Sequence, residues 1–232
     1  MPRKPKRHEL QQRGYRIKNG LECAPKPRLI LPERHLFVTE GTKTEPYYLE
    51  GLVNLICERY GTQAKKQFNI IGEGDNTLNL LQKAESYQQN ESDGYQHIWL
   101  IYDKDDFPPD AFDNTMSRCN AINKRFEDEQ RDTKFHAIWS NQCFELWFIL
   151  HFDYLQSDIE REQYRDILST HIGRHYEKND STIFATLYPN LNTALKNAKR
   201  LMNTYPMECP PSQKAPATNF YELIEHLGEY LK

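Results

Sequence analysis

The stretch "RHLFVTEGTKTEPYYLEGLVNLICERYG", residues 34–61, joins two hydrophobic patterns of different period. Its first seven residues, "RHLFVTE", predict a short buried strand, and the residues from Gly41 onward predict a helix. In that helix Leu49, Leu52 and Ile56 recur at helical spacing, and Gly61 is placed to end it. A buried strand followed directly by an amphipathic helix is the unit of α/β proteins.

The same unit recurs three times along the chain. Further strands are predicted at "KQFNIIGEG" (66–74), "YQHIWLIYDKDD" (95–106) and "FHAIWSN" (135–141). Helical patterns lie between them, from Leu78 toward Tyr87 and over "NTMSRCNAINKRFEDE" (114–129). Strands that alternate with helices predict a mostly parallel sheet with helices on both faces, so the expected fold class is α/β.

The pattern changes after the fourth strand. "CFELWFILHF" (143–152) predicts a buried helix, and polar helical patterns follow around 161–168, 192–202 and 220–230. The Pro-rich segment "TYPMECPPSQKAPATN" (204–219) predicts a loop. We therefore expect a basic N-terminal arm over 1–33, an α/β domain over 34–150, and a helical extension over 151–232 that packs on the core.

Charge is distributed unevenly over the 232 residues. The net charge of −3 comprises +6 on residues 1–20, with seven basic side chains and one acidic one, and −9 on the remainder. A basic arm on an acidic body is typical of a tail that contacts nucleic-acid phosphates, and it is equally compatible with a solvated terminus. The chain gives no sign of its oligomeric state, so a homo-oligomer stays open.

Cysteine usage and hydropathy indicate the compartment. The start of the chain lacks an apolar run after its charges, and the longest apolar run is too short to span a bilayer, so we expect no membrane association. Five scattered cysteines without CxxC spacing argue against a disulfide framework and against a cysteine-based zinc site. A reducing, cytoplasmic setting is expected.

Acidic residues end two of the predicted strands. Glu40 follows the first strand, and Asp103, Asp105 and Asp106 follow the third. Ligands bind at the carboxyl ends of strands in parallel sheets, so these carboxylates converge if the two strands are neighbours. Several carboxylates in one crevice raise one another's pKa and call for a cation. Oxygen ligands without His or Cys predict Mg²⁺, with Mn²⁺ as a substitute.

The order of these acids resembles a known signature. A Glu-Gly pair after the first strand and a DxD motif after the third resemble the TOPRIM signature of topoisomerases, primases and OLD-family nucleases. Four stretches are similar, in order, to motifs of the RloB-like family of bacterial TOPRIM proteins linked to phage defence: "VTEGTKTEPYYLEGL", "WLIYDKDDF", "IWSNQCFELWFILHF" and "APATNFYELIEHL". The match covers most of residues 34–230. One departure is the stretch "KAPATN", where the family has an Asn-Pro-Ser-Thr-like sequence.

The resemblance implies a TOPRIM-like fold and a metal-dependent nuclease of phage defence or abortive infection, often encoded beside an ATPase partner. It assigns Glu40 as general acid or base or as a metal ligand, and Asp103 and Asp105 as metal ligands. Glu45 resembles the second glutamate of OLD-type nucleases, which binds another metal. Its alternative is a favourable interaction with the helix N-terminus.

Further residues are candidates for the same site. Gly41 keeps the backbone open beside it, and Glu145, a carboxylate in an apolar block, must be paired or metal-bound. Ser140 and Asn141 are candidates for phosphate contacts. Lys43 and Lys104 either neutralise transition-state charge or balance the acids. His151 is a candidate for substrate contact, with a satisfied core histidine as the alternative.

Two other functions stay open. The chain could be a catalytically silent TOPRIM module that binds or regulates within a defence complex. A phosphate-binding nucleotide domain would need a glycine-rich loop, and "GEGDN" (72–76) is a poor match that more plausibly forms a turn. The substrate of a nuclease, whether DNA, tRNA or other RNA, is not determined by the sequence.

Overall fold

A computed structural model describes residues 30–74, 77–91, 94–104 and 109–231 of the chain. Apart from residue 30, these residues belong to the compact unit Leu31–Lys232. Its strands are β1 (His35–Thr39), β2 (Phe68–Gly72), β3 (His97–Asp103), β4 (Lys134–Asn141) and β5 (Ala217–Thr218). Its α-helices are α2 (Thr44–Tyr60), α3 (Thr77–Asn90), α4 (Pro109–Asp128), α5 (Glu145–Ile149), α6 (Arg161–Ile172), α7 (Ile183–Leu187), α8 (Leu191–Met202) and α9 (Phe220–Leu231).

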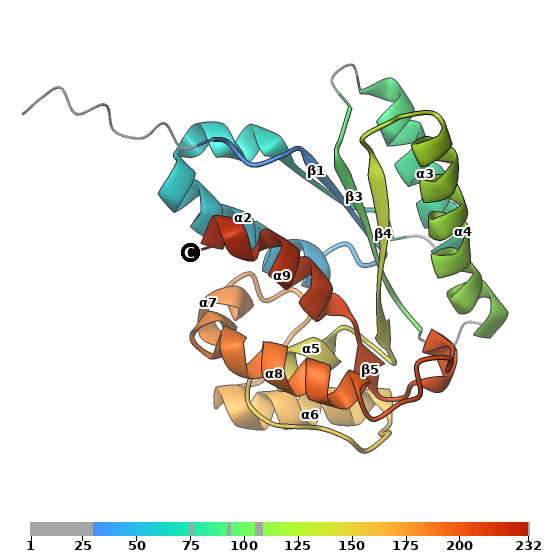
Figure 1. Cartoon of the computed structure of the whole chain (residues 1–232). Helices are drawn as coiled ribbons and strands as arrows, with labels where there is room; N and C mark the ends of the chain where they lie inside the picture. The colour runs from blue at the N-terminus through green and yellow to red at the C-terminus, as the bar shows by residue number, and fades with distance from the viewer. Residues whose placement is uncertain (1–29, 75–76, 92–93, 105–108, 232) are drawn as a thin grey trace, which may run out of the picture. The chain divides into compact units, whose positions relative to one another are not determined.

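The strands form one sheet in the order β2-β1-β3-β4-β5. The first four strands are parallel, and β5 pairs with β4 in the antiparallel direction. Helices flank the sheet, and α9 follows β5 at the C-terminal end of the chain (Figure 1). The predicted α/β class with a mostly parallel sheet is confirmed. Because β1 and β3 are neighbours, their carboxyl ends meet at one edge of the sheet.

Alternating side chains give each face of the sheet its own core. Leu36, Val38 and Leu100 pack with apolar residues of α3 and α4. Phe37, Trp99 and Ile101 point to the other face, where they share a core with α2 and with α5 to α9. Figure 1 shows α3 and α4 on one side of the sheet and α2 and α9 on the other. Both faces of β1 and β3 are therefore buried, which explains their continuous apolar sequences.

The opening strand and helix form where the sequence predicts them. β1 is buried throughout, and α2 ends at Gly61, whose φ of 84° suits glycine and whose N–H donates to Cys57 O over 2.8 Å. Residues 40–43 join the two elements. This short connection places Glu40 and Gly41 at the carboxyl edge of the sheet.

Three features differ from the sequence prediction. The buried helix expected over 143–152 is shorter, because α5 spans only Glu145–Ile149. The five-residue α7 was not predicted. A loop throughout 204–219 is wrong, because this segment contains the 3-10 helix η3 (Pro211–Gln213) and β5. Two more 3-10 turns, η1 (Thr62–Gln67) and η2 (Tyr188–Asn190), precede β2 and α8.

Two expectations concern the chain as a whole. Within the described ranges, no helix is both long and apolar enough to cross a lipid bilayer. The cysteines that the structure describes, Cys57, Cys119, Cys143 and Cys209, are all free thiols.

Candidate functional site

The carboxyl ends of β1 and β3 bring Glu40 and Asp103 together. The Glu40 N–H continues the β1–β3 ladder by donating to Ile101 O over 2.9 Å. The backbone N–H of Asp103 donates to Glu40 Oε2 over 3.3 Å. Two acids that are 63 residues apart in the sequence therefore meet at one edge of the sheet. Asp103 is 7% exposed and Glu40 is half-buried.

Gly41 makes room for the Glu45 carboxylate. A Cβ built at Gly41 would lie 2.1 Å from Glu45 Oε2, far inside van der Waals contact. Glu45 stands in the first turn of α2, is 4% exposed, and folds back against the backbone that follows Glu40. The backbone of residues 41–42 also lies against Gly72 at the end of β2, where a Cβ would lie 2.9 Å from Gly41 O. Two glycines thus let the loop after β1 pack tightly beside the acids.

Asp103 also connects β3 to the segment after β4. Its Oδ2 accepts a hydrogen bond of 3.0 Å from the backbone N–H of Phe144, the residue before α5. This bond holds the start of α5 close to the carboxyl edge of the sheet. Glu145, the first residue of α5, follows directly and is 2% exposed.

Glu145 is paired with a residue that the sequence did not indicate. Lys178 Nζ lies 3.6 Å from Glu145 Oε1, and the Lys178 carbonyl accepts a 3.2 Å bond from Thr44 Oγ1 at the start of α2. The segment between α6 and α7 therefore contacts both helices beside the acids. Lys178 lies in the polar stretch "HYEKND", which carries no apolar period or motif, so nothing in the sequence could have assigned this contact.

Two groups near Glu145 stay protonated. Burial, followed by the charges of Glu145 and Asp103, raises the pKa of the Cys143 thiol far above its usual range. Burial and Glu145 likewise raise the pKa of the Tyr176 hydroxyl. A thiol in this state is a poor nucleophile, so the arrangement does not favour cysteine chemistry.

Ser140 and Asn141 lie at the end of β4, but their side chains are engaged inside the protein. Ser140 Oγ lies 3.1 Å from Thr218 Oγ1 of β5, and Asn141 Nδ2 donates to the carbonyls of Pro211 and Ser212. Both residues are 2% exposed. The structure therefore places their side chains as contacts between β4 and the segment around β5.

His151 is likewise a core residue. It is 1% exposed, its Nε2 lies 3.3 Å from the Tyr48 hydroxyl, and its Nδ1 lies 2.9 Å from Trp147 O. Both ring nitrogens are used within the core. The structure thus does not bring His151 to the strand-end carboxylates, in agreement with the alternative of a satisfied core histidine.

The remaining candidates occupy more open positions. Lys43 is exposed in the loop after β1, and Lys104 is half-buried, with its N–H donating to Ser140 O over 2.9 Å. Asp105 and Asp106 lie outside the described residues. Of "GEGDN", Gly72 ends β2, the N–H groups of Glu73 and Gly74 donate to Thr39 O and Glu40 O, and the Glu73 carboxylate bonds to Lys83 and Tyr87.

The donors at this edge fit a hard cation. Glu40, Glu45, Asp103 and Glu145 supply carboxylate oxygens, the ligands that Mg²⁺ prefers. Among the described residues these carboxylates do not bring three ligand atoms within 4.8 Å of one another. Mg²⁺ commonly uses only one or two protein carboxylates and completes its shell with water and substrate phosphates. The Glu40–Asp103 pair meets that requirement.

Comparison with known proteins adds one finding. The family model described as "RloB-like protein" matches residues 35–227, which run from the first residue of β1 into α9. No curated protein sequence matches the chain. The matched range includes every residue of the described candidate site.

Proposed function

The chain belongs to the RloB-like family, and on this premise we propose that it is a TOPRIM-type, metal-dependent nuclease that hydrolyses phosphodiesters of DNA or RNA in the cytoplasm. The observation that carries the proposal is the contact between Glu40 and Asp103 at the carboxyl ends of neighbouring parallel strands. This edge is where ligands bind in such sheets. The resemblance further suggests a role in phage defence beside an ATPase partner.

The residues have distinct roles in this proposal. Glu40 and Asp103, with Asp105 and Asp106, would hold Mg²⁺ or Mn²⁺, which when bound supplies Lewis-acid stabilisation of phosphodiester charge. Glu40, the more exposed of the two described acids, exchanges a proton with the attacking water or the leaving group.

Charged side chains around the acids complete the proposed site. Glu45 and Glu145 fix the loop after β1 and the start of α5, and in doing so they orient the acids. Lys43, exposed beside them, is available to a substrate phosphate.

One observation favours a second function. Glu45, Asp103 and Glu145 are only 4%, 7% and 2% exposed, so this arrangement is largely closed to a bulky substrate. A closed acidic edge suits a catalytically silent subunit that binds or regulates within a defence complex.

Cleavage assays separate the two functions. The purified full chain is incubated with Mg²⁺ or Mn²⁺ and duplex DNA, single-stranded DNA or total tRNA, alone and with any ATPase encoded beside it. We expect cleavage that falls at least about a hundredfold in Glu40→Gln and in Asp103→Asn, because each removes a charged group from the reacting centre. Asp128→Asn, an exposed acid at the end of α4, is the matched control.

The outcomes differ clearly. Cleavage that is lost in both site variants and kept in Asp128→Asn would support the nuclease and identify its substrate class. Absence of cleavage under all conditions, with a folded protein, would favour the silent subunit. Cleavage of equal rate in all variants would mean that the reaction uses another site or a contaminant.

A further inference from the structure

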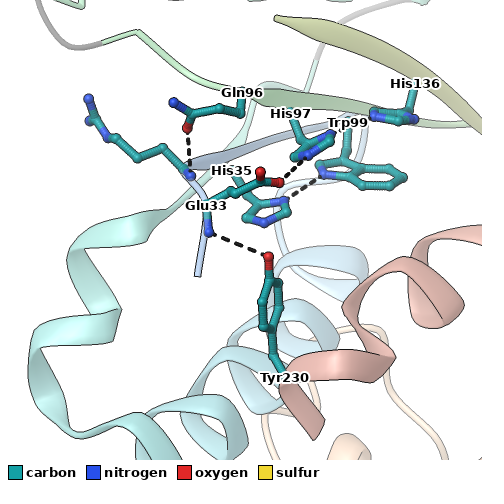
Figure 2. A network of polar contacts seen from close by, with 8 residues as sticks. Glu33, His35, Gln96, His97, Trp99, His136 and Tyr230 are labelled. Carbon is teal, nitrogen blue, oxygen red and sulfur yellow. Dashed lines mark hydrogen bonds and ion pairs between the residues drawn. The ribbon is translucent and has the colours of Figure 1, made fainter. Parts of the chain in front are cut away.

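Four of the eight histidines gather at the amino ends of the strands, opposite the carboxylate edge. His35 and His97 are the first residues of β1 and β3, His136 lies in β4, and His226 lies in α9. Glu33 precedes β1 beside them, and Figure 2 shows it next to His97. From His97 to Asp103 is the length of β3, about 20 Å at the usual rise per residue. This histidine cluster is therefore separate from the candidate nuclease site.

Three of these side chains lie close enough together to bind one metal ion. One ligand atom each from Glu33, His97 and His226 lies within 4.8 Å of the others, the one such group among the described residues. Glu33 Oε2 and His97 Nε2 are 2.7 Å apart, and the rings of His97 and His226 are 4.2 Å apart between centroids. Ligands of a tetrahedral zinc ion lie about 3.3 Å from one another. Small side-chain shifts are enough to convert the group into a coordination site.

Neighbouring contacts hold the ligands in place. His97 Nδ1 lies 3.0 Å from His136 Nε2, and the His136 ring is stacked on Trp99 at 3.8 Å. The Glu33 backbone N–H donates to the Tyr230 hydroxyl from α9 over 3.4 Å, as Figure 2 shows. A histidine ligand whose second nitrogen is hydrogen-bonded is oriented for metal binding. Here that second partner is His136.

We infer that Glu33, His97 and His226 form a site for a divalent transition-metal ion of the zinc class. Two imidazoles and one carboxylate are donors that Zn²⁺ and its neighbours in the first transition row accept well, whereas Mg²⁺ prefers oxygen alone. Glu33 is 56% exposed, so the site is open on one side and leaves a fourth position for water or another ligand.

The contacts of His97 are consistent with this role. Its Nε2 faces Glu33 Oε2, where the ion would bind, and its Nδ1 lies 3.0 Å from His136 Nε2, which would accept a hydrogen bond from Nδ1–H once the metal is bound.

His35 lies beside these ligands but is fully buried. His35 is not a ligand in this scheme, because its Nδ1 accepts a 3.1 Å bond from Trp99 Nε1.

A metal ion at this place would cross-link three segments that are distant in the sequence. It would join Glu33, two residues before β1, to His97 at the start of β3 and His226 in α9. The link between Glu33 and His226 spans nearly the whole compact unit in sequence. Binding would thus stabilise the packing of α9 on the sheet, independently of phosphodiester hydrolysis.

The test is zinc binding by the full chain after removal of any affinity-tag histidines. We expect titration calorimetry, in excess Mg²⁺, to show one Zn²⁺ per chain, and Co²⁺ to give the visible absorption of a four-coordinate site. The midpoint of thermal unfolding should rise by about 5–10 °C at free zinc a hundredfold above Kd. Glu33→Gln and His226→Gln should each weaken binding at least about tenfold. Glu33 is exposed and lies outside the strands, so its variant keeps the fold.

Two control variants test whether zinc binding depends on the ligands themselves or only on the loss of any nearby acid or any histidine. Glu229→Gln removes an exposed acid of α9 that lies near His226 but outside the ligand set, and His175→Gln removes an exposed histidine. Both should bind zinc within about threefold of the unaltered protein. Absence of stoichiometric zinc binding, or binding that persists in both ligand variants, would overturn the inference.

Discussion

At the scale of single residues, His151 shows how the core fixes a protonation state. Its Nδ1–H donates to Trp147 O and its Nε2 accepts from the Tyr48 hydroxyl, so the neutral ring satisfies both contacts. Burial lowers the pKa of His151 to about 4, although its backbone contacts act in the opposite direction. A protonated ring would place a charge and a second N–H against Tyr48 in a buried environment. Acid should therefore destabilise the fold at this residue.

The pH dependence of unfolding tests this. The folded pKa lies below the usual 6.5, so the unfolded chain takes up the proton first and stability falls as pH drops below about 6.5, until the loss ends near pH 4. At pH 5 the loss from this ring is roughly 2 kcal/mol. His151→Gln cannot titrate, so its free energy of unfolding should fall by that much less between pH 7 and 5 in urea titrations. The variant His175→Gln, at an exposed position, should show the same pH dependence as the unaltered protein. If the free energy of unfolding changes equally with pH in the unaltered protein and in both variants, His151 does not cause the loss.

These residues also mark how far sequence reasoning reaches. Glu40 and Asp103 could each be placed at the carboxyl end of a strand from the sequence, but that β1 and β3 are neighbours comes from the structure. The partners of Ser140, Asn141 and His151 could not be placed, because Thr218, Pro211 and Tyr48 are distant in sequence and no period relates them. The same holds for Glu33, His97 and His226, which no metal-ligand spacing connects.

At the scale of elements, the two-residue β5 and the following Asn219 close the edge of β4. Asn219 Oδ1 accepts from Trp139 N–H over 2.7 Å, and its Nδ2 donates to Ala137 O over 3.0 Å. The side-chain amide thus bonds the β4 backbone as another strand would. The "APATN" stretch therefore has a structural role. It pairs with β4 at Ser140, and Ser140 pairs on its other side with Asp103 of β3.

Removal of the Asn219 side-chain amide should lower the free energy of unfolding. Asn219→Ala leaves the buried Trp139 N–H without an acceptor, and we expect a loss of about 2–3 kcal/mol in the free energy of unfolding. Asn219→Asp keeps the acceptor and should lose less. Asn192→Ala, an exposed asparagine of α8, should stay within about 0.5 kcal/mol of the unaltered protein. Urea unfolding measures all three, and a loss below about 0.5 kcal/mol in Asn219→Ala would show that the edge closes without the amide.

The sequence did not indicate β5 for a physical reason. Two residues are too few to show an alternating pattern, and the surrounding prolines favour a loop. α2 was predictable because its helical period extends over 17 residues, and β1 and β3 because each is a continuous run of apolar, strand-forming residues. Short elements such as β5 and α7 exist only through contacts with the rest of the fold.

At the scale of the whole molecule, the two ends of the sheet carry different kinds of potential metal ligand. Its carboxyl edge gathers oxygen donors and its amino edge gathers imidazoles. Because both arise from strand ends, the proposed Mg²⁺ site and the proposed Zn²⁺ site would lie at opposite edges of one sheet. Activity at the first edge and stability at the second should then respond to different metals.

The basic residues near the N-terminus supply the last prediction, which concerns nucleic-acid binding by the full chain. Residues 1–20 carry +6, whereas the rest of the chain carries −9 and repels phosphates. If these basic side chains bind phosphates, removing each of them should reduce the slope of log K against log salt by about 0.9 for duplex DNA. Fluorescence anisotropy over a salt series compares the unaltered chain with a variant that carries Gln at Arg3, Lys4, Lys6 and Arg7. Lys65→Gln with Lys66→Gln, both exposed beside β2, is the matched control and should leave the slope unchanged. A slope that falls only in the control would place the phosphate contacts on the folded body instead.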